Sequence, residues 1–438
     1  MKKKSVRIGM LGVGTVGGGV VKILQRNREL IARRTGIDFE IVHATVHDVT
    51  LDWGVDLDEG VLHDDIEKVV SDDSLQIVIE LMGGVDKTGD IVMRVLANGK
   101  DVVTANKAML AERGEEIYAV AREHGRCIAF EASCCGGIPL VGAMRSGLAA
   151  NRISEFFGIV NGTCNYILSS MDQHAKEYDV ALQEAQKAGY AEADPTLDIN
   201  GADSAHKLTI MAALAYGKQV DYDQIEFCGI EEVDLSDIRF GRELGYTLKL
   251  LASANQYEGG LALTVHPAFV HEASPMAQVS GVYNAVSIYG DEVGHTLYYG
   301  QGAGRFPTAS AVVADLIDVA RGNSARLFAS MPGFGQPAEA AAICPRQERE
   351  SRFYLRLNVE DQPGVLAQVT KILGDNRISI TACLQQEKSH ADTVPLIITT
   401  HQATQGHMDK ALATLNQGSF VGNPTVCIPI VTVPDDHK

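Results

Sequence analysis

An acid-rich segment between residues 189 and 207 contains the side chains best suited to chemistry. Four carboxylates lie in the twelve residues from Glu192 to Asp203. A helical pattern begins at residue 202, so Asp203 and Lys207 stand at i and i+4 on one helix face. Such an ion pair is ordinarily a weak surface feature. The neighbouring helix positions are apolar, however, and Glu192 and Asp198 are near in sequence. The segment therefore favours a site in which carboxylates hold an ammonium group and the lysine faces a carbonyl oxygen.

Residues 12–17 read Gly-Val-Gly-Thr-Val-Gly, between an apolar run, Val6–Met10, and an amphipathic segment, Val20–Ile31. The first glycine permits a tight turn, the second admits a pyrophosphate, and the third lets helix and strand pack closely. A glycine turn that serves packing alone is the alternative. We expect this turn to place dinucleotide phosphates at a helix N-terminus. The residues concerned are Gly12, Val13, Gly14, Thr15, Val16 and Gly17.

Two further segments would border the nicotinamide of such a cofactor. Thr104-Ala105-Asn106-Lys107 follows a predicted parallel strand, and ligands of open parallel sheets bind beyond the carboxyl ends of the strands. Lys107 would then lie near the nicotinamide, although a solvated loop lysine explains the position equally well. The glycine-rich turn at residues 300–304, which contains Gly302, either closes over the nicotinamide or simply begins a helix.

Two more loops have open roles. Residues 131–139, EASCCGGIP, combine the Glu131 carboxylate with exposed carbonyl groups that could hold a hard cation, but a rigid loop explains the spacing as well. Asn161-Gly162-Thr163 either caps the helix that follows or binds a carboxylate at its N-terminus. The adjacent Cys134 and Cys135 could include a nucleophile, but no histidine stands at a suggestive place nearby.

The composition argues against several classes of protein. The chain has 438 residues, of which 38 are basic and 56 acidic, giving a net charge of −18, so nonspecific nucleic-acid binding is not expected. No run approaches the roughly 20 apolar residues of a membrane span. Three lysines at residues 2–4 precede apolar residues, but no cleavage pattern follows, so we expect an intact cytoplasmic N-terminus. The eight cysteines form no CxxC pair, which favours reduced thiols over a zinc or disulfide scaffold.

The pattern along the chain predicts an α/β protein of three domains. In residues 1–138, strands alternate with helices, which indicates a Rossmann-type doubly wound parallel sheet. Residues 139–330 mix helix and strand patterns and predict an α+β catalytic and dimerisation domain, whose final helix, about 308–321, can pack back on the first domain. Residues 331–351 contain three prolines and predict a linker. Residues 352–434 have the order strand, turn, helix, strand of a ferredoxin-like regulatory module.

Hydrophobic periodicity also predicts individual elements. Strands are expected at Ile41–Val46, Ser74–Leu81, Asp101–Ala105, Cys127–Phe130, Ile153–Val160, Leu261–Val270, Val286–Tyr289, His295–Tyr299, Phe353–Val359 and Thr425–Val433. Helices are expected at Asp90–Ala97, Ala111–His124, Leu140–Ala150, Tyr166–Gln173, Val180–Ala188, Ala202–Ala215, Thr308–Arg321 and Leu366–Gly374.

Together these segments resemble homoserine dehydrogenase over nearly the full chain. The matching stretches are GVGTVG at 12–17, TANK at 104–107, EASCCGGIP at 131–139, NGTCNYIL at 161–168, GYAEADPTLDINGADSAHKL at 189–208 and GQGAGRFPTASAVVAD at 300–315. Residues 353–433 resemble an ACT domain, of which DQPGVLAQVTKILGDNRISI is typical. No aspartokinase-like region precedes the glycine turn, so the resemblance is to the monofunctional form.

The resemblance implies reversible reduction of L-aspartate 4-semialdehyde to L-homoserine with NADP or NAD. Lys207 would protonate the nascent alkoxide, and Lys107 would assist between nicotinamide and substrate. The residues implied to bind substrate are Glu192, Asp198, Asp203, Tyr190, Gly162 and Thr163. Those implied to bind the cofactor are residues 12–17, Thr104, Lys107 and Gly302. Those implied to bind Na⁺ are Glu131 through its carboxylate and Cys134, Gly136 and Ile138 through their carbonyl groups.

The ACT domain implies feedback inhibition by threonine, and the resemblance suggests a homodimer or a homotetramer. The chain departs from the family after its second strand, where many relatives have an arginine suited to a 2′-phosphate. Here His47 replaces it, and Asp48 could accept a ribose hydroxyl, so we expect NAD to be used at least as well as in relatives.

Two rival interpretations make different demands on the sequence. Another ACT-bearing dehydrogenase, acting on a hydroxy acid, would need a catalytic histidine with an arginine or glutamate, and none stands at a suitable place. A catalytically inactive amino-acid sensor would have lost Lys207 or the carboxylates, which are present.

Overall fold

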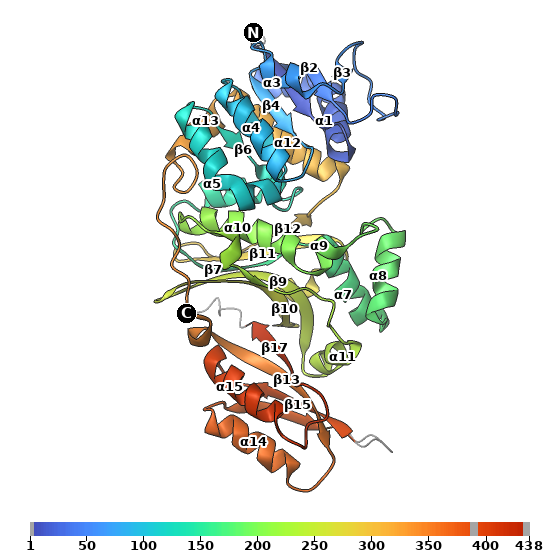
Figure 1. The fold of residues 1–438 in the computed structure, drawn as a ribbon, viewed down its shortest axis with the longest axis vertical. Coiled ribbons are helices and arrows are strands. Elements are labelled where there is room, and N and C mark those ends of the chain that lie inside the picture. The colour runs from blue at the N-terminus through green and yellow to red at the C-terminus, as the bar shows by residue number, and fades with distance from the viewer. Residues whose placement is uncertain (1–3, 386–392, 432–438) are drawn as a thin grey trace. The chain divides into compact units, whose positions relative to one another are not determined.

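The computed structural model describes residues 4–385 and 393–431 (Figure 1). The chain divides into two compact units. The first unit contains residues 1–154, 203–225 and 283–341, and the second contains residues 155–202, 226–282 and 342–438. Residues 139–330, which the sequence predicts as one domain, contribute to both units. The predicted domain boundaries therefore stay a prediction.

A six-stranded parallel sheet forms the centre of the first unit, as the alternation of strands and helices predicts. Its strands lie in the order β3-β2-β1-β4-β5-β6. They are β3 Leu62–His63, β2 Ile37–Thr45, β1 Lys4–Leu11, β4 Ile77–Glu80, β5 Asp101–Thr104 and β6 Ile128–Ala129. The chain reverses its direction of progress between β1 and β4, and ligands of open α/β sheets bind at such a switch point.

Helices enclose this sheet: α1 Thr15–Arg26, α2 Arg28–Thr35, α3 Ile66–Ser71, α4 Asp86–Ala97, α5 Lys107–Glu123, α12 Arg305–Ala320 and α13 Asn323–Ser330. The predicted continuous helix Val20–Ile31 is wrong in one respect, because Asn27 leaves helical geometry and separates α1 from α2. Helix α12 packs on α1, where a Cβ on Gly19 would lie 2.6 Å from the carbonyl oxygen of Arg305.

Further helices, short turns and a hairpin complete the first unit. They are η1 Glu131–Ser133, α6 Leu140–Gly142 with the wide turn η2 Ala143–Gly147, α10 Ala202–Tyr216, η3 Tyr222–Gln224, and the antiparallel hairpin of β11 Tyr283–Gly290 and β12 Gly294–Gln301. The predicted helix Leu140–Ala150 is too long: α6 widens after Gly142 and ends with η2 at Gly147.

A seven-strand path runs through the sheet of the second unit in the order β7-β9-β10-β17-β13-β15-β14. These strands are β7 Ile153–Ile159, β9 Tyr246–Tyr257, β10 Gly260–His271, β17 Val426–Val431, β13 Glu350–Glu360, β15 Thr393–Thr400 and β14 Ile380–Gln385, with β8 Glu226–Phe227 beside β10 and β16 Ala403–Thr404 beside β13. The helices are α7 Gly162–His174, α8 Tyr178–Lys187, α9 Thr196–Ile199, α11 Leu235–Glu243, α14 Val365–Asp375 and α15 Gln405–Asn416, with the short turns η4 Pro275–Gln278 and η5 Arg346–Glu348.

The C-terminal elements follow the order β13-α14-β14-β15-α15-β17 and have a core of their own, which confirms the ferredoxin-like prediction. Of the predicted strand Thr425–Val433, residues 432 and 433 lie outside the described residues, and β17 covers Val426–Val431. β17 also pairs in parallel with β10 through Phe269 and Val270. The regulatory module thus continues a sheet that begins with β7.

A buried ion pair fixes the first strand of this module to α11. Arg356 on β13 donates two hydrogen bonds, of 2.6 and 2.8 Å, to the Asp237 carboxylate. The Tyr354 hydroxyl donates a third, of 2.9 Å, to the same group. Because Asp237 is only 1% exposed, its oxygens depend on these three donors for hydrogen bonds.

The eight cysteines all lie in the described parts of the chain and are free thiols. Within those same parts, no helix combines the length and apolar character needed to cross a bilayer.

Candidate active site

One carboxylate in the first unit lies between two lysine ammonium groups. Lys207 Nζ is 2.7 Å from Asp203 Oδ2, and Lys107 Nζ is 3.2 Å from Asp203 Oδ1. Asp203 and Lys207 stand one turn apart on α10, and Lys107 is the first residue of α5. α5 begins there because the Asn106 side chain accepts a hydrogen bond from the Met109 N–H. The structure therefore brings together two residues predicted for catalysis and one predicted for the substrate.

Burial and charge act in opposite directions on Lys207. Its side chain is 11% exposed, and burial alone would lower the pKa of the ammonium group. Burial is the largest single influence, but the Asp203 carboxylate and the nearby Cys135 and Cys134 sulfur atoms together outweigh it, so the pKa of Lys207 lies above its usual range. Lys207 is consequently protonated at neutral pH and can stabilise negative charge on an oxygen or donate a proton to it. Lys107 is more open, with a side chain 36% exposed.

Glu80, which the sequence interpretation missed, organises the loops next to Lys107. It ends β4 and is fully buried. Its Oε1 accepts from the Met82 N–H at 2.7 Å and the Gly83 N–H at 3.3 Å, and its Oε2 accepts from the Thr104 hydroxyl at 2.6 Å. Burial raises the pKa of the Glu80 carboxyl, while these donors oppose the rise. The sequence feature that could have identified Glu80 is a single acidic residue at the end of an otherwise apolar strand.

A second set of hydrogen bonds extends this arrangement to the start of α5. The Thr104 hydroxyl oxygen accepts from the Asn106 N–H at 3.0 Å, and Asn106 Nδ2 donates to the Gly84 carbonyl at 2.7 Å. The carboxyl ends of β4 and β5 are thereby fixed to each other immediately before Lys107. Thr104 thus serves first as a link to Glu80, and its role in cofactor binding stays a prediction.

We expect Glu80→Ala to lower the free energy of unfolding by about 2–4 kcal/mol, because the buried Thr104 hydroxyl and the partly buried Met82 and Gly83 N–H groups lose their acceptor. Glu80→Gln keeps an oxygen for the Met82 and Gly83 N–H groups and should lose about 1 kcal/mol or less. Chemical denaturation followed by circular dichroism measures both values. Equal stability of the alanine and glutamine variants would show that the Glu80 hydrogen bonds do not hold these loops.

The glycine turn has the geometry that a pyrophosphate requires. Gly12 has φ of +97°, and a Cβ on Gly17 would lie 2.3 Å from the Gly12 carbonyl oxygen, so both positions exclude other residues. A Cβ on Gly14, by contrast, would meet no atom within 4 Å. Gly14 also precedes α1, whose first turn contains no acidic residue and receives no side-chain cap. Open space before exposed N–H groups fits an anionic ligand, and this fit supports a bound dinucleotide.

Gly302 and the Glu131 loop have structural tasks that are compatible with their predicted roles. A Cβ on Gly302 would lie 2.0 Å from Asn284 Nδ2, so this turn needs glycine for packing. The Glu131 carboxylate accepts the Val141 and Gly142 N–H groups at 2.8 Å each. The backbone N–H of Glu131 donates to the Asp315 carboxylate at 2.7 Å.

A cation at this loop would share its oxygens with these N–H donors. The carbonyl oxygen of Ile138 already accepts the Leu140 N–H at 2.7 Å, and Cys134 and Gly136 lie in the same buried loop. Among the described residues, no group of three or more histidine, cysteine, aspartate or glutamate side chains could hold a metal ion. The Na⁺ site stays a prediction.

In the second unit, four of the residues predicted for the substrate lie together. Thr163 Oγ1 is 2.6 Å from the Tyr190 carbonyl oxygen and 3.3 Å from Asp198 Oδ2. Asn161 Nδ2 donates to Asp198 Oδ1 at 2.9 Å, while Asn161 Oδ1 accepts from the Cys164 N–H and caps α7. A Cβ on Gly162, the first residue of α7, would lie 2.8 Å from the Val282 carbonyl oxygen.

The described contacts of Glu192 are made by its backbone rather than by its carboxylate. Glu192 is exposed, and its carbonyl oxygen accepts from Gln186 Nε2 at 3.2 Å. Tyr190, in the same segment, is 45% exposed and contacts the ring of Tyr166. The cluster is therefore formed by Gly162, Thr163, Tyr190 and Asp198.

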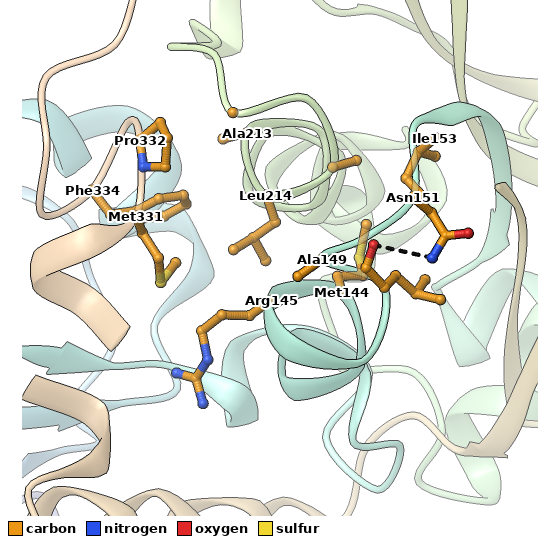
Figure 2. A pocket seen from close by; sticks show the side chains of 13 residues that line it. Met144, Arg145, Ala149, Asn151, Ile153, Ala213, Leu214, Met331, Pro332 and Phe334 are labelled. Atoms are coloured by element: carbon orange, nitrogen blue, oxygen red, sulfur yellow. Dashed lines mark hydrogen bonds between the residues drawn. The ribbon is translucent and has the colours of Figure 1, made fainter. Parts of the chain in front are cut away.

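Two cavities in the described residues lie away from the predicted site residues. Figure 2 shows one of about 160 Å³ in the first unit, where Leu214 from α10 approaches Met144 and Ala149. Its lining is mostly apolar, and Arg145 extends along one side of it. A larger cavity in the second unit, of about 410 Å³, is lined by residues of the sheet and of α15. Neither lining includes the lysines or the carboxylates described above.

Three family models match the chain in succession. The model described as homoserine dehydrogenase, NAD binding domain, covers residues 12–131, that described as homoserine dehydrogenase covers 139–317, and that described as ACT domain covers 353–417. A homoserine dehydrogenase of Pseudomonas aeruginosa is 42% identical over 98% of this chain and 99% of its own length. One of Neisseria gonorrhoeae is 41% identical over 99% of this chain and 100% of its own.

Solved structures agree with these matches. A homoserine dehydrogenase from Thiobacillus denitrificans superposes with a TM-score of 0.92 at 42% identity, covering 98% of this chain and 99% of that one. A hyperthermophilic archaeal homoserine dehydrogenase in complex with NADPH superposes with a TM-score of 0.62 at 26% identity, covering 72% and 98%. With the lysine–carboxylate cluster and the glycine turn in place, the chain belongs to the homoserine dehydrogenase family of NAD(P)-dependent oxidoreductases.

Proposed function

We propose that the protein reversibly reduces L-aspartate 4-semialdehyde to L-homoserine with NADH or NADPH, in the biosynthesis of threonine, methionine and isoleucine. The observation that carries the proposal is the Asp203 carboxylate held between the Lys107 and Lys207 ammonium groups. This cluster begins directly after β5, on the edge of a parallel sheet where ligands bind.

The chemistry follows from the charge on the aldehyde oxygen. The bound cofactor supplies the hydride. Negative charge then develops on the oxygen, and the Lys207 ammonium stabilises that charge and donates its proton. Asp203 keeps Lys207 protonated and fixes its direction. Lys107, on the other oxygen of Asp203, assists between nicotinamide and substrate.

The remaining assignments rest on the family resemblance. The substrate carries an ammonium and a carboxylate, which suit acidic side chains and a helix N-terminus. We assign Gly162, Thr163, Tyr190, Glu192, Asp198 and Asp203 to the substrate. Residues 12–17, Thr104, Lys107 and Gly302 are assigned to the cofactor. Glu131, with the carbonyl groups of Cys134, Gly136 and Ile138, is assigned to Na⁺.

We further propose feedback inhibition by threonine through the ACT domain, and assembly as a homodimer or homotetramer. The turn at residues 361–364, which precedes α14, is exposed and ends in Gly364 with φ of +94°. An exposed, preformed turn of this kind suits a small ligand. The free thiols agree with a reducing compartment, for which the cytoplasm is our proposal.

The test is oxidation of NADH or NADPH, followed at 340 nm, with aspartate semialdehyde as substrate. We expect turnover, and we expect saturating threonine to lower the rate about 5-fold or more, as typical allosteric couplings do. The variant Gln362→Ala should retain the uninhibited rate but respond less to threonine. Threonine binding without turnover would instead identify an amino-acid sensor and contradict the proposal.

A further inference from the structure

We propose that the protein selects NAD over NADP, and that Asp48 is the residue that determines this choice. The inference deepens the proposed function, on which it rests, because it names the dinucleotide that the glycine turn accepts. It depends on the loop of residues 46–61, which follows β2.

The loop lies beside the glycine turn and α1. The Gly12 N–H donates to the Thr45 carbonyl at 3.1 Å, so the end of β2 adjoins the first glycine. Farther along, Val55 would lie 3.5 Å from a Cβ on Gly18, and Gln25 Nε2 donates to the Asp56 carbonyl. In Rossmann folds the ribose of the adenosine half lies at this end of the second strand.

Asp48 has a fixed direction within the loop. Its Oδ1 accepts from the Thr50 N–H at 2.8 Å and from the Thr50 hydroxyl at 2.6 Å. Its carbonyl oxygen accepts from the Trp53 indole N–H at 2.8 Å. No other described residue donates to its Oδ2, and the hydrogen bonds from Thr50 lower the pKa of the carboxyl. One oriented, ionised oxygen is therefore available to accept from a ribose hydroxyl.

The charge of the loop disfavours a 2′-phosphate. Residues 46–61 contain Asp48, Asp52, Asp56, Asp58 and Glu59 but neither lysine nor arginine. Lys22 of α1 is the nearby cation, since its Nζ would lie 3.9 Å from a Cβ on Gly54, and it faces five carboxylates in this loop. The Arg26 guanidinium of α1 lies over the Phe306 ring, 5.7 Å from its centroid. His47 packs edge-on against Trp53, with ring centroids 4.9 Å apart.

These features distinguish the two cofactors by a simple rule. The free 2′-hydroxyl of NAD can donate a hydrogen bond to Asp48. The 2′-phosphate of NADP cannot, and it carries up to two negative charges toward a carboxylate. This repulsion and the lost hydrogen bond both disfavour NADP, so we expect NAD to bind about tenfold more tightly.

Trp53 makes the test direct, because it is the single tryptophan of the chain. Its indole N–H donates a hydrogen bond to the Asp48 carbonyl oxygen. We would titrate the full chain with NAD⁺ and, separately, NADP⁺, excite the indole at about 295 nm, and confirm the affinities by calorimetry. The measurement needs no substrate, so its outcome is independent of turnover. Wild type should show the tighter binding of NAD⁺. Equal or tighter binding of NADP⁺ would overturn the proposal.

Two matched variants assign the effect to Asp48. Asp48→Asn removes the charge but keeps an oxygen for Thr50, and it should reduce the preference for NAD⁺ about tenfold. Asp52→Asn removes the same charge from the same loop, where Asp52 accepts from the Gly54 N–H at 2.7 Å. It should leave the preference unchanged. Equal shifts in both variants would assign selection to the loop's total charge and overturn the role of Asp48.

Discussion

Lys207→Met is expected to lower kcat for aspartate semialdehyde reduction by about 10³–10⁴-fold, because it removes both the proton donor and the charge that stabilises the oxygen. Methionine has a similar length and keeps the apolar stem, so the fold should survive. KM should change little, since the lost interaction acts mainly in the transition state. Initial rates at 340 nm across substrate concentrations give both constants.

A matched control is Lys218→Met. Lys218 belongs to the same unit, but its ammonium pairs with the exposed Glu339 at 2.7 Å, and we assign it no role in the reaction. The kcat of the Lys218→Met variant should equal that of the wild-type protein. Comparable rates for the two variants would remove Lys207 from the chemical step.

The dependence of the reduction rate on pH provides a second test of the role of Lys207. The proposed acid must be protonated, so reduction slows as pH rises through its pKa. Because Asp203 raises that pKa above the usual range, wild-type activity should show no decline from this group at or below pH of about 10. A decline near neutral pH that disappears in Lys207→Met would contradict the environment described here.

Asp237→Ala should produce the largest loss of stability, about 3–5 kcal/mol, because it leaves the half-buried Arg356 without its partner. The substitution also removes the acceptor of the Tyr354 hydroxyl. Chemical denaturation of the full chain, followed by circular dichroism, should show the C-terminal module unfolding at lower denaturant concentration. The substitution removes a structural contact of the second unit. The pKa of Lys207, in the first unit, should therefore stay unchanged.

Two comparisons separate burial from charge. The double variant Asp237→Ala with Arg356→Leu should lose less stability than Asp237→Ala alone, because no unpaired charge remains. Asp375→Ala removes a carboxylate of the same unit that pairs with Lys371 on the exposed surface of α14, and it should change stability by no more than about 0.5 kcal/mol. Equal losses for Asp237→Ala and Asp375→Ala would contradict the buried role of Asp237.

Local sequence patterns predicted the elements that depend on neighbouring residues. The glycine turn follows from spacing alone, and so does the shared helix face of Asp203 and Lys207 on α10. Strands β4, β5 and β6 are short, mostly buried and flanked by helices, and their positions were predicted within a few residues. The longer and more exposed β2 was predicted within four residues at its start. Motifs of this kind carry their meaning in a continuous stretch of chain.

Features that depend on distant residues were missed. Strand β9 has seven consecutive buried residues, from Leu248 to Ala254, so it shows none of the alternation that reveals a half-buried strand. The contact of Glu80 with Thr104 joins two strands 24 residues apart. The pairing of β10 with β17 joins still more distant segments. No local period encodes such partners, and only the fold brings them together.

The most direct measurement is the distance between Lys207 Nζ and the hydroxyl oxygen of homoserine in a crystal structure with the oxidised cofactor bound. We predict about 3 Å, with the nicotinamide ring facing the carbon that bears this oxygen. If the Lys207 ammonium lies beyond hydrogen-bond reach of that oxygen while another side chain contacts it, Lys207 is not the acid and the mechanism proposed here is wrong.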